Sequence, residues 1–256
     1  MCQYIIFFNQ KIGTFPIFIG AGLLALTFLI AYQIKKFNLD NNSENKIMVC
    51  IPLSVLFGCI TGYFSDVIFR GGIKAVFSPW GYGMTFYGWL LGCILFYTVY
   101  SKILNIRTSF LLNFFLPAFS LAQSIGRVGC FLGGCCFGCP VSYGGISYPK
   151  GSLPYSIYKD ALLFPVQLWE SFYLLIVFFI LFFLIKFKYR AAVYLLMLSG
   201  GRFVFEFLRG DNRGKLFIDL LSPAQIISLS ILFCTIIFLI NKIFSLDYRQ
   251  IIKQVI

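Results

Sequence analysis

Seven long apolar stretches dominate this chain. They cover residues 15–34, 47–69, 83–104, 108–126, 164–186, 190–208 and 222–244. A bilayer core about 30 Å thick is crossed by about 20 apolar residues in a helical conformation. Lipid offers the backbone no hydrogen bonds, so a spanning segment must pair its own amides, as a helix does. The sequence therefore predicts an all-α, polytopic membrane protein with about seven transmembrane helices.

The composition leaves little room for a separate soluble domain. Apolar residues make up 59% of the 256 residues and charged residues 12%, whereas soluble domains carry about 25% charged residues. We expect residues 1–256 to form a single integral membrane domain. The one long connection, residues 127–163, contains the turn-forming stretch GGISYPKGSLPYS. We expect it to be an irregular, non-helical insertion between the fourth and fifth helices.

The net charge of +12 does not indicate a nucleic-acid partner. The 21 Lys and Arg residues are scattered over every connection, and no basic run is longer than two. This pattern indicates membrane topology and attraction to anionic lipid head groups. With the N-terminus outside, the inside connections hold 11 positive residues and the outside ones nine. That difference favours this orientation only weakly.

Several ionisable residues fall inside or at the ends of the apolar stretches. Arg202, Glu206 and Arg209 are spaced i, i+4 and i+7, on one stripe of a helix, while Arg127 ends the fourth stretch and Glu170 begins the fifth. Charges in a bilayer are costly and mark functional sites by default. One interpretation is that they pair to lock helices together. The other is that the arginines, which exceed what Glu206 alone can neutralise, bind the phosphate of a phospholipid.

Four ordered blocks resemble a known family. The run GRVGCFLGGCCFG (126–138) resembles the signature of the bacterial prolipoprotein diacylglyceryl transferases, which is close to G-R-[ILV]-G-N-F-x-N-G-E-x-x-G. The blocks TFYGWLLG (85–92), FPVQLWE (164–170) and GGRFVFEFLRGD (200–211) are similar to the other conserved blocks of that family, in the same order.

The resemblance implies an activity. The family moves the diacylglyceryl group of phosphatidylglycerol onto the thiol of a lipobox cysteine in a prolipoprotein, and it releases glycerol phosphate. It works in the bacterial plasma (inner) membrane, near the extracytoplasmic side, so the insertion is implied to be extracytoplasmic. The implied partners are phosphatidylglycerol or another anionic phospholipid and the prolipoprotein signal peptide. We expect no cofactor, and a monomer.

Residue by residue, the resemblance also implies a site. The catalytic positions are Arg127 and Arg202, which match the family's essential arginines, together with Tyr87 and Glu206. The implied lipid- and phosphate-binding residues are Arg127, Arg202, Arg209, Gly126, Gly129, Gly134, Gln167 and Glu170.

The chain departs from the family at residues that could act on the acceptor thiol. It contains no histidine, and Tyr87 stands where the family has a histidine that could act as a base. The signature asparagines are Cys130 and Gly133 here. A general base with a pKa near 7 is therefore missing, and Glu206, Glu170 or a thiol near the arginines are the remaining candidates. Three alternatives stay open: a family paralogue with another acceptor, a small anion or lipid transporter, and a non-catalytic lipid-binding protein.

The signature run is rich in cysteine, with the pattern C-x4-C-C-x2-C. Zinc sites favour paired C-x2-C motifs, often with histidine; only one such pair is present, so we expect no metal site. If the insertion is extracytoplasmic, as the resemblance implies, oxidation is permitted. Cys139 could then pair with Cys130 or Cys135. Small apolar packing residues and a catalytic cysteine are the other interpretations.

Overall fold

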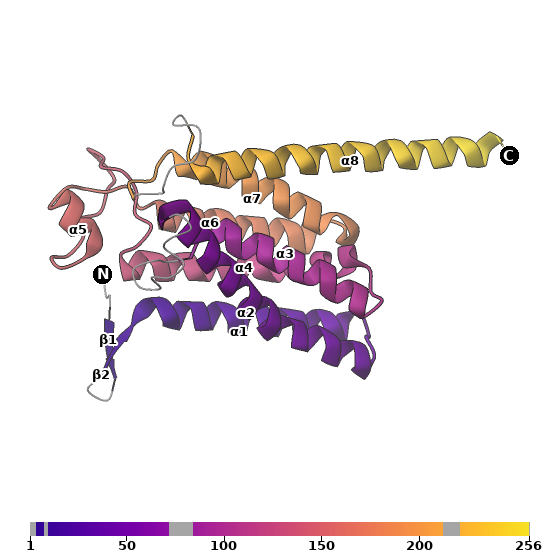
Figure 1. The fold of residues 1–256 in the computed structure, drawn as a ribbon, viewed down its shortest axis with the longest axis horizontal. Helices are drawn as coiled ribbons and strands as arrows, with labels where there is room; N and C mark the ends of the chain where they lie inside the picture. Colours follow the sequence, from indigo (N-terminus) through magenta and orange to yellow (C-terminus); the bar gives the residue numbers. More distant parts are fainter. Residues whose placement is uncertain (1–3, 8–9, 72–83, 212–220, 256) are drawn as a thin grey trace.

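The computed structural model describes residues 4–7, 10–71, 84–211 and 221–255. In these residues the chain is almost entirely helical, which confirms the all-α prediction. The described strands are β1 (Tyr4–Phe7) and β2 (Gln10–Gly13), which pair in an antiparallel hairpin before the first helix. Figure 1 shows this hairpin at one end of a bundle of long helices.

In the described part of the chain, seven helices of 14 residues or more form the bundle, with shorter helical pieces between them. The helices are α1 (Thr14–Lys36), α2 (Asn41–Gly71), α3 (Phe86–Ile103), α4 (Thr108–Gly133), α6 (Val166–Phe179), α7 (Arg190–Glu206) and α8 (Pro223–Val255). The shorter pieces are α5 (Leu153–Tyr158), the π-helical turn η2 (Ile180–Leu184), which continues α6, and the 3-10 turn η3 (Phe187–Tyr189).

Within the described residues, six of these helices are long and apolar enough to cross a membrane: α1, α2, α3, α4, α6 with η2, and α8. The prediction of a multi-pass membrane protein is therefore confirmed. The predicted span 190–208 corresponds to α7, which has 17 residues and contains Arg190, Arg202 and Glu206. Because α7 is not among the six, the count of seven spans stays a prediction.

Helix α4 lies at the centre of the bundle. It packs against α1, α3, α6 and α7, while α2 lies along α3 and α8 lies along α7 (Figure 1). Small residues allow the closest of these approaches. A Cβ atom on Gly22 of α1 would lie 2.8 Å from the carbonyl oxygen of Ala122 in α4. The two backbones are therefore in direct contact at this point.

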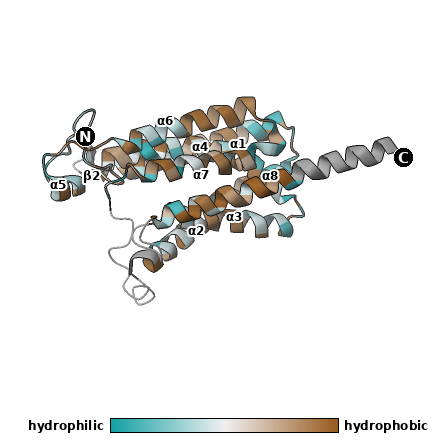
Figure 2. Ribbon diagram, turned by 90° about the horizontal axis from the view of Figure 1, so that it is seen from above, coloured by the Kyte–Doolittle hydropathy of each residue, from teal (hydrophilic) through white to brown (hydrophobic). Residues whose placement is uncertain are grey.

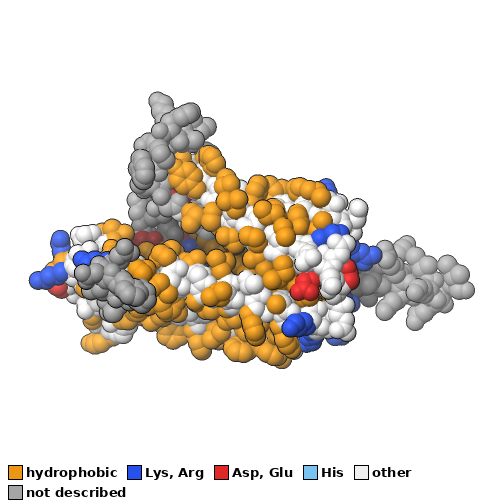
Figure 3. All heavy atoms as spheres, turned by 90° about the horizontal axis from the view of Figure 1, so that it is seen from below, with side chains coloured by type: hydrophobic (Ala, Val, Ile, Leu, Met, Phe, Trp, Pro, Cys, Tyr) orange, Lys and Arg blue, Asp and Glu red, His pale blue; other side chains and the backbone are white. Residues whose placement is uncertain are grey.

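The outer faces of the helices are apolar. Leu24 and Phe28 of α1 are more than 70% exposed, and Phe233 of α8 is 66% exposed. Figure 2 shows hydrophobic residues along the lengths of the helices, and Figure 3 shows Lys, Arg, Asp and Glu gathered towards the two ends of the molecule. An apolar belt between two polar ends is the surface that a bilayer requires.

Short turns close one end of the bundle. Two residues after the last residue of α1 and of α3, the chain has an asparagine in the left-handed region, Asn38 with φ 48° and Asn105 with φ 54°. Asparagine adopts this conformation more readily than most residues, so it ends a helix and reverses the chain sharply. The opposite end carries the β-hairpin and the long insertion (Figure 1).

The predicted boundaries of the insertion are wrong in two places. Helix α4 does not end at residue 126 but continues through Gly133, and α5 forms a helical turn inside the segment predicted to be irregular. Gly126 and Gly129 of the signature lie inside α4 and face α1. A Cβ atom on Gly129 would lie 2.6 Å from the Cβ atom of Phe18 in α1. Most of residues 134–165 consists of turns and isolated bridges around the buried Phe137.

The packing of α1 on α4 makes a testable prediction. Gly22→Ala should lower the midpoint of thermal unfolding in detergent, because the new methyl group meets the backbone of α4 and overpacking costs about 1–3 kcal/mol. Gly20→Ala is the matched control, since a Cβ atom there has nothing within 4 Å. Equal midpoints for the two variants would contradict the close contact.

Candidate active site

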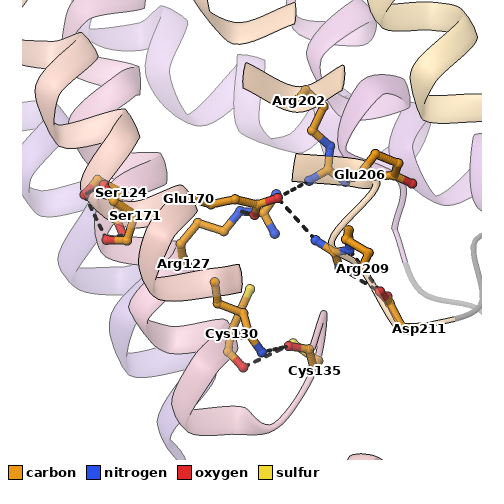
Figure 4. A network of polar contacts seen from close by, with 11 residues as sticks. Ser124, Arg127, Cys130, Cys135, Glu170, Ser171, Arg202, Glu206, Arg209 and Asp211 are labelled. Carbon is orange, nitrogen blue, oxygen red and sulfur yellow. Dashed lines mark hydrogen bonds and ion pairs between the residues drawn. The ribbon is translucent and has the colours of Figure 1, made fainter. Parts of the chain in front are cut away.

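Glu170 lies at the centre of a buried cluster of charges. It stands in the first turns of α6, and its carboxylate contacts arginines from two other helices. Arg127 of α4 places Nε 2.8 Å from Oε2, and Arg202 of α7 places Nη1 2.6 Å from Oε1. The side chain of Glu170 is 5% exposed. Figure 4 shows the two arginines and Arg209 converging on this carboxylate.

Hydrogen bonds between α4 and α6 set the position of this pair. Ser124 Oγ donates to the carbonyl oxygen of Ser171 at 2.8 Å, and Ser171 Oγ donates to that of Ser124 at the same distance. Ser124 is one helical turn before Arg127, and Ser171 directly follows Glu170. The reciprocal bonds therefore fix the two helices where the arginine and the carboxylate must meet.

Arg209 reaches the cluster from outside α7. The predicted single helical stripe is wrong, because α7 ends at Glu206 and Arg209 lies in the turn that follows. An antiparallel bridge to Gly138 holds this turn, with the Cys139 amide donating to the carbonyl oxygen of Leu208 at 2.9 Å. The insertion thus positions Arg209, whose Nη1 lies 3.4 Å from Glu170 Oε1.

Acidic partners balance the arginines. Arg209 makes a two-pronged contact with Asp211, at 2.9 and 3.1 Å, and Arg202 Nη2 lies 3.4 Å from Glu206 Oε2. Three arginines therefore face three carboxylates. Glu206 alone does not neutralise the arginines, as predicted, and Glu170 and Asp211 supply the other two negative charges. Sequence reasoning missed Asp211, although the spacing R-x-D in the last block was a usable signal.

The arginines still keep hydrogen-bond donors for a ligand. Each guanidinium has five N–H groups. Arg127 contacts Glu170 through Nε, which leaves its two terminal nitrogens outside that ion pair. Arg202 Nε is buried, and no described group accepts its hydrogen. Such an orphaned donor is costly unless a ligand or water fills its place.

A hollow adjoins the cluster and combines charged with apolar walls. Arg127, Arg202 and Glu170 form its polar side. The remaining lining residues are Phe86, Gln123, Tyr173, Leu174, Leu198, Gly201 and Phe205. A site with guanidinium groups at one side and aliphatic and aromatic side chains around the rest suits a molecule that is anionic at one end and apolar at the other.

Tyr87 and Glu206 lie at the side of the cluster that faces α8. The hydroxyl group of Tyr87 forms a hydrogen bond with Ser228, and Ser222 Oγ donates to Glu206 Oε1 at 3.1 Å. Tyr87 is buried and is not among the residues that line the hollow, whereas its neighbour Phe86 is. Both predicted catalytic residues are therefore near the arginines but tied to α8 and to the segment just before it.

The remaining predicted binding residues contact other parts of the protein around the arginine cluster. Gln167 Nε2 donates to the carbonyl oxygen of Cys135 at 2.8 Å and to the Tyr148 hydroxyl group at 3.1 Å. Gly126 and Gly129 face α1 rather than the arginines, and Gly134 ends α4. Direct phosphate binding by these residues stays a prediction, since the contacts that the structure gives them are internal.

The cysteines of the signature gather beside the arginines. Cys130, Cys135 and Cys136 place their sulfur atoms within 4.8 Å of one another, and in the described part of the chain neither these three nor Cys139 forms a disulfide. The predicted disulfide from Cys139 to Cys130 or Cys135 stays a prediction. Sequence spacing missed this spatial cluster, because four residues separate the first two members.

Comparisons with known proteins agree with the resemblance. A family model described as Prolipoprotein diacylglyceryl transferase matches residues 3–241. Two relatives are named phosphatidylglycerol--prolipoprotein diacylglyceryl transferase. The one from Clostridium tetani is 31% identical over 230 residues, which cover 87% of this chain and 90% of the relative. The one from Clostridium perfringens, numbered 2, is 30% identical over 247 residues, which cover 92% and 93%.

The central position of Glu170 predicts a large effect on stability. Glu170→Gln removes the charge that Arg127 and Arg202 share, and leaving buried cations without their partner costs about 3–5 kcal/mol. The midpoint of thermal unfolding in detergent should fall markedly. Glu44→Gln on α2 is the control, since this acid lies in the first turn of its helix and should change stability by less than about 1 kcal/mol. Similar small shifts for both would contradict the central role of Glu170.

Proposed function

Because the chain belongs to the prolipoprotein diacylglyceryl transferase family, we propose that it transfers the diacylglyceryl group of phosphatidylglycerol to the thiol of a lipobox cysteine in a prolipoprotein. Glycerol phosphate is the leaving group. The observation that carries the proposal is the hollow beside Arg127 and Arg202, which joins two guanidinium groups to an apolar wall. The names of the relatives supply the two substrates.

The arginines have a defined task in this reaction. As the bond between the glyceryl carbon and the phosphate oxygen breaks, negative charge develops on the departing phosphate. Guanidinium groups held in place before the reaction stabilise that charge strongly in a site of low dielectric constant. Arg127 and Arg202 meet this requirement, since Glu170 and the helices fix both and each retains donors outside its ion pairs. The apolar walls of the hollow lie beside the guanidinium groups, where the glyceryl end of the lipid would enter.

In this proposal, the arginine cluster and the hollow beside it lie near the extracytoplasmic side of the bacterial inner membrane. The insertion lies at one end of the bundle and the short turns at the other (Figure 1). The cluster is on the side of the insertion, because Gly138 of the insertion pairs with Arg209. Those turns and the adjoining helix ends carry Lys35, Lys36, Lys102, Arg107, Lys186 and Lys188. Positive residues favour the cytoplasmic side, which supports the orientation.

A second candidate keeps the donor and changes the acceptor. The departures from the family signature fall at Cys130, Gly133 and Cys135, on or just after the last turn of α4. They alter the surroundings of the incoming nucleophile and leave Arg127, Arg202 and Glu170 in place. The favoured acceptor remains the lipobox thiol, because the relatives carry that substrate in their names.

Product release distinguishes these candidates. The purified protein is given phosphatidylglycerol labelled in its head group, with or without a lipobox peptide, and released glycerol phosphate is measured. Release that depends on the peptide supports the proposed function. Release that depends on another thiol or alcohol supports the altered acceptor. If no acceptor leads to release and the protein carries anions across liposome membranes, the transferase proposal is contradicted and a transporter is supported.

The planar guanidinium groups of Arg127 and Arg202 predict the effect of replacing each arginine with lysine. Arg127→Lys and Arg202→Lys should each lower the rate of glycerol phosphate release by about 100-fold or more, because a lysine has one nitrogen and lacks the planar guanidinium whose separate nitrogens can contact Glu170 and a phosphate at the same time. Arg107→Lys, at the exposed start of α4, is the control and should keep the rate. A rate within about threefold of the parent in either variant would remove that arginine from the mechanism.

A further inference from the structure

We propose that the three clustered cysteines form a metal site, in which Cys130, Cys135 and Cys136 bind one Zn²⁺ whose fourth ligand is the thiolate of the acceptor. The proposal rests on the function given above and supplies what that function lacks, a means of ionising the acceptor thiol in a chain without histidine. Coordination to a divalent cation deprotonates a thiol directly, so no protein base with a pKa near 7 is needed.

The end of α4 brings the first two thiols together. Gly134, with φ 72°, reverses the chain in the left-handed conformation, and its amide donates to the carbonyl oxygen of Phe131 at 3.2 Å. The amide of Cys135 donates to the carbonyl oxygen of Cys130 at 3.1 Å. This pair of bonds is the Schellman motif, which places the side chain after the turn over the last turn of the helix. Here the Cys135 thiol donates to the carbonyl oxygen of Cys130 at 3.7 Å (Figure 4), and the sulfur atoms of the two residues lie within 4.8 Å of each other.

The third thiol depends on an unusual backbone conformation. Cys136 has φ 60°, a region that residues other than glycine, asparagine and aspartate seldom adopt. Such conformations persist where the surrounding structure holds them, and they gather at binding sites. Gln167 supplies part of that hold, because its amide group donates to the carbonyl oxygen of Cys135.

The geometry suits a tetrahedral ion with one open position. A Zn–S bond of about 2.3 Å places tetrahedral sulfur ligands about 3.8 Å apart. The three sulfur atoms lie within 4.8 Å of one another, so shifts of about 1 Å or less complete the site. Within the described residues, no fourth cysteine or carboxylate joins the group. Three protein ligands and one exchangeable position are the arrangement of catalytic zinc sites.

The surrounding charges favour this site next to the phosphate site. Three thiolates and one Zn²⁺ carry a net charge of −1. Cys136 is close enough to Arg127 and Arg209 to interact electrostatically with both guanidinium groups. The acceptor sulfur would therefore be held beside the arginines that bind the phosphate.

The transfer step balances without a redox change. The acceptor thiol releases its proton to solvent as it coordinates. A sulfur lone pair then forms the C–S bond with the glyceryl carbon, and the electron pair of the broken C–O bond leaves on the phosphate oxygen of glycerol phosphate. The thioether product binds zinc weakly compared with a thiolate, so it dissociates and the position reopens.

Cobalt substitution tests the metal site apart from the activity. The reduced, full-length protein is titrated with Co²⁺, and the expected result is one equivalent with thiolate-to-cobalt charge transfer in the near ultraviolet and the visible bands of tetrahedral Co²⁺. Cys136→Ser should weaken binding by at least about tenfold, while Cys139→Ser, outside the trio, should not. Absence of the charge-transfer band, or equal binding by both variants, overturns the site. So does a disulfide between two of the three cysteines in protein isolated from cells.

A lipobox peptide tests the fourth ligand. Adding the peptide to the cobalt protein should increase the charge-transfer band, and a peptide with serine in place of its cysteine should not. An unchanged band overturns the role of the metal in acceptor binding. Protein stripped with a chelator should lose the release of glycerol phosphate, and Zn²⁺ should restore it. If the zinc-loaded protein releases none while the cobalt spectra hold, the proposed function fails and the metal site stands.

Discussion

One carboxylate holds three arginines in a place where charge is expensive. Glu170 contacts Arg127 and Arg202 at 2.8 and 2.6 Å and Arg209 at 3.4 Å, and these contacts tie α4, α6 and the turn after α7 to one point. Removing ions from water costs several kcal/mol each, so such a cluster is stable only when its members satisfy one another. The surrounding helices must therefore lie where these arginines and carboxylates can pair.

The same condition explains why the cluster can bind a ligand at all. Three carboxylates balance three guanidinium groups, so the empty site carries no excess charge that would have to be stabilised by water. Specificity for an anion then comes from directed N–H groups rather than from net charge. The unpaired donor of Arg202 and the terminal nitrogens of Arg127 are such groups, and they lie beside apolar walls that exclude water.

Much of this was visible in the sequence, for physical reasons. Hydropathy located the long helices, because a bilayer imposes one length on every span. The cost of intramembrane charge singled out Arg127, Glu170, Arg202 and Glu206, and the structure brings all four together. The end of α4 was misplaced because glycine both ends helices and permits close packing, and only the contact with α1 shows which effect wins at Gly129. Arg209 was assigned to the wrong element for a related reason, since its position depends on a long-range bridge to Gly138 that no local pattern records.

The signature run illustrates why spacing alone is a poor guide to chemistry in a turn. Along the chain, Cys130 and Cys135 are too far apart for a paired ligand motif, but the left-handed Gly134 folds the chain back so that they become neighbours. The turn that aligns these thiols is also the start of the segment that carries Gly138, and Gly138 pairs with Arg209. A single helix end therefore sets the distance between the thiol cluster and the arginine cluster. An attacking sulfur and a departing phosphate oxygen must lie on opposite sides of one carbon atom, and a fixed turn between their binding groups is a direct way to meet that requirement.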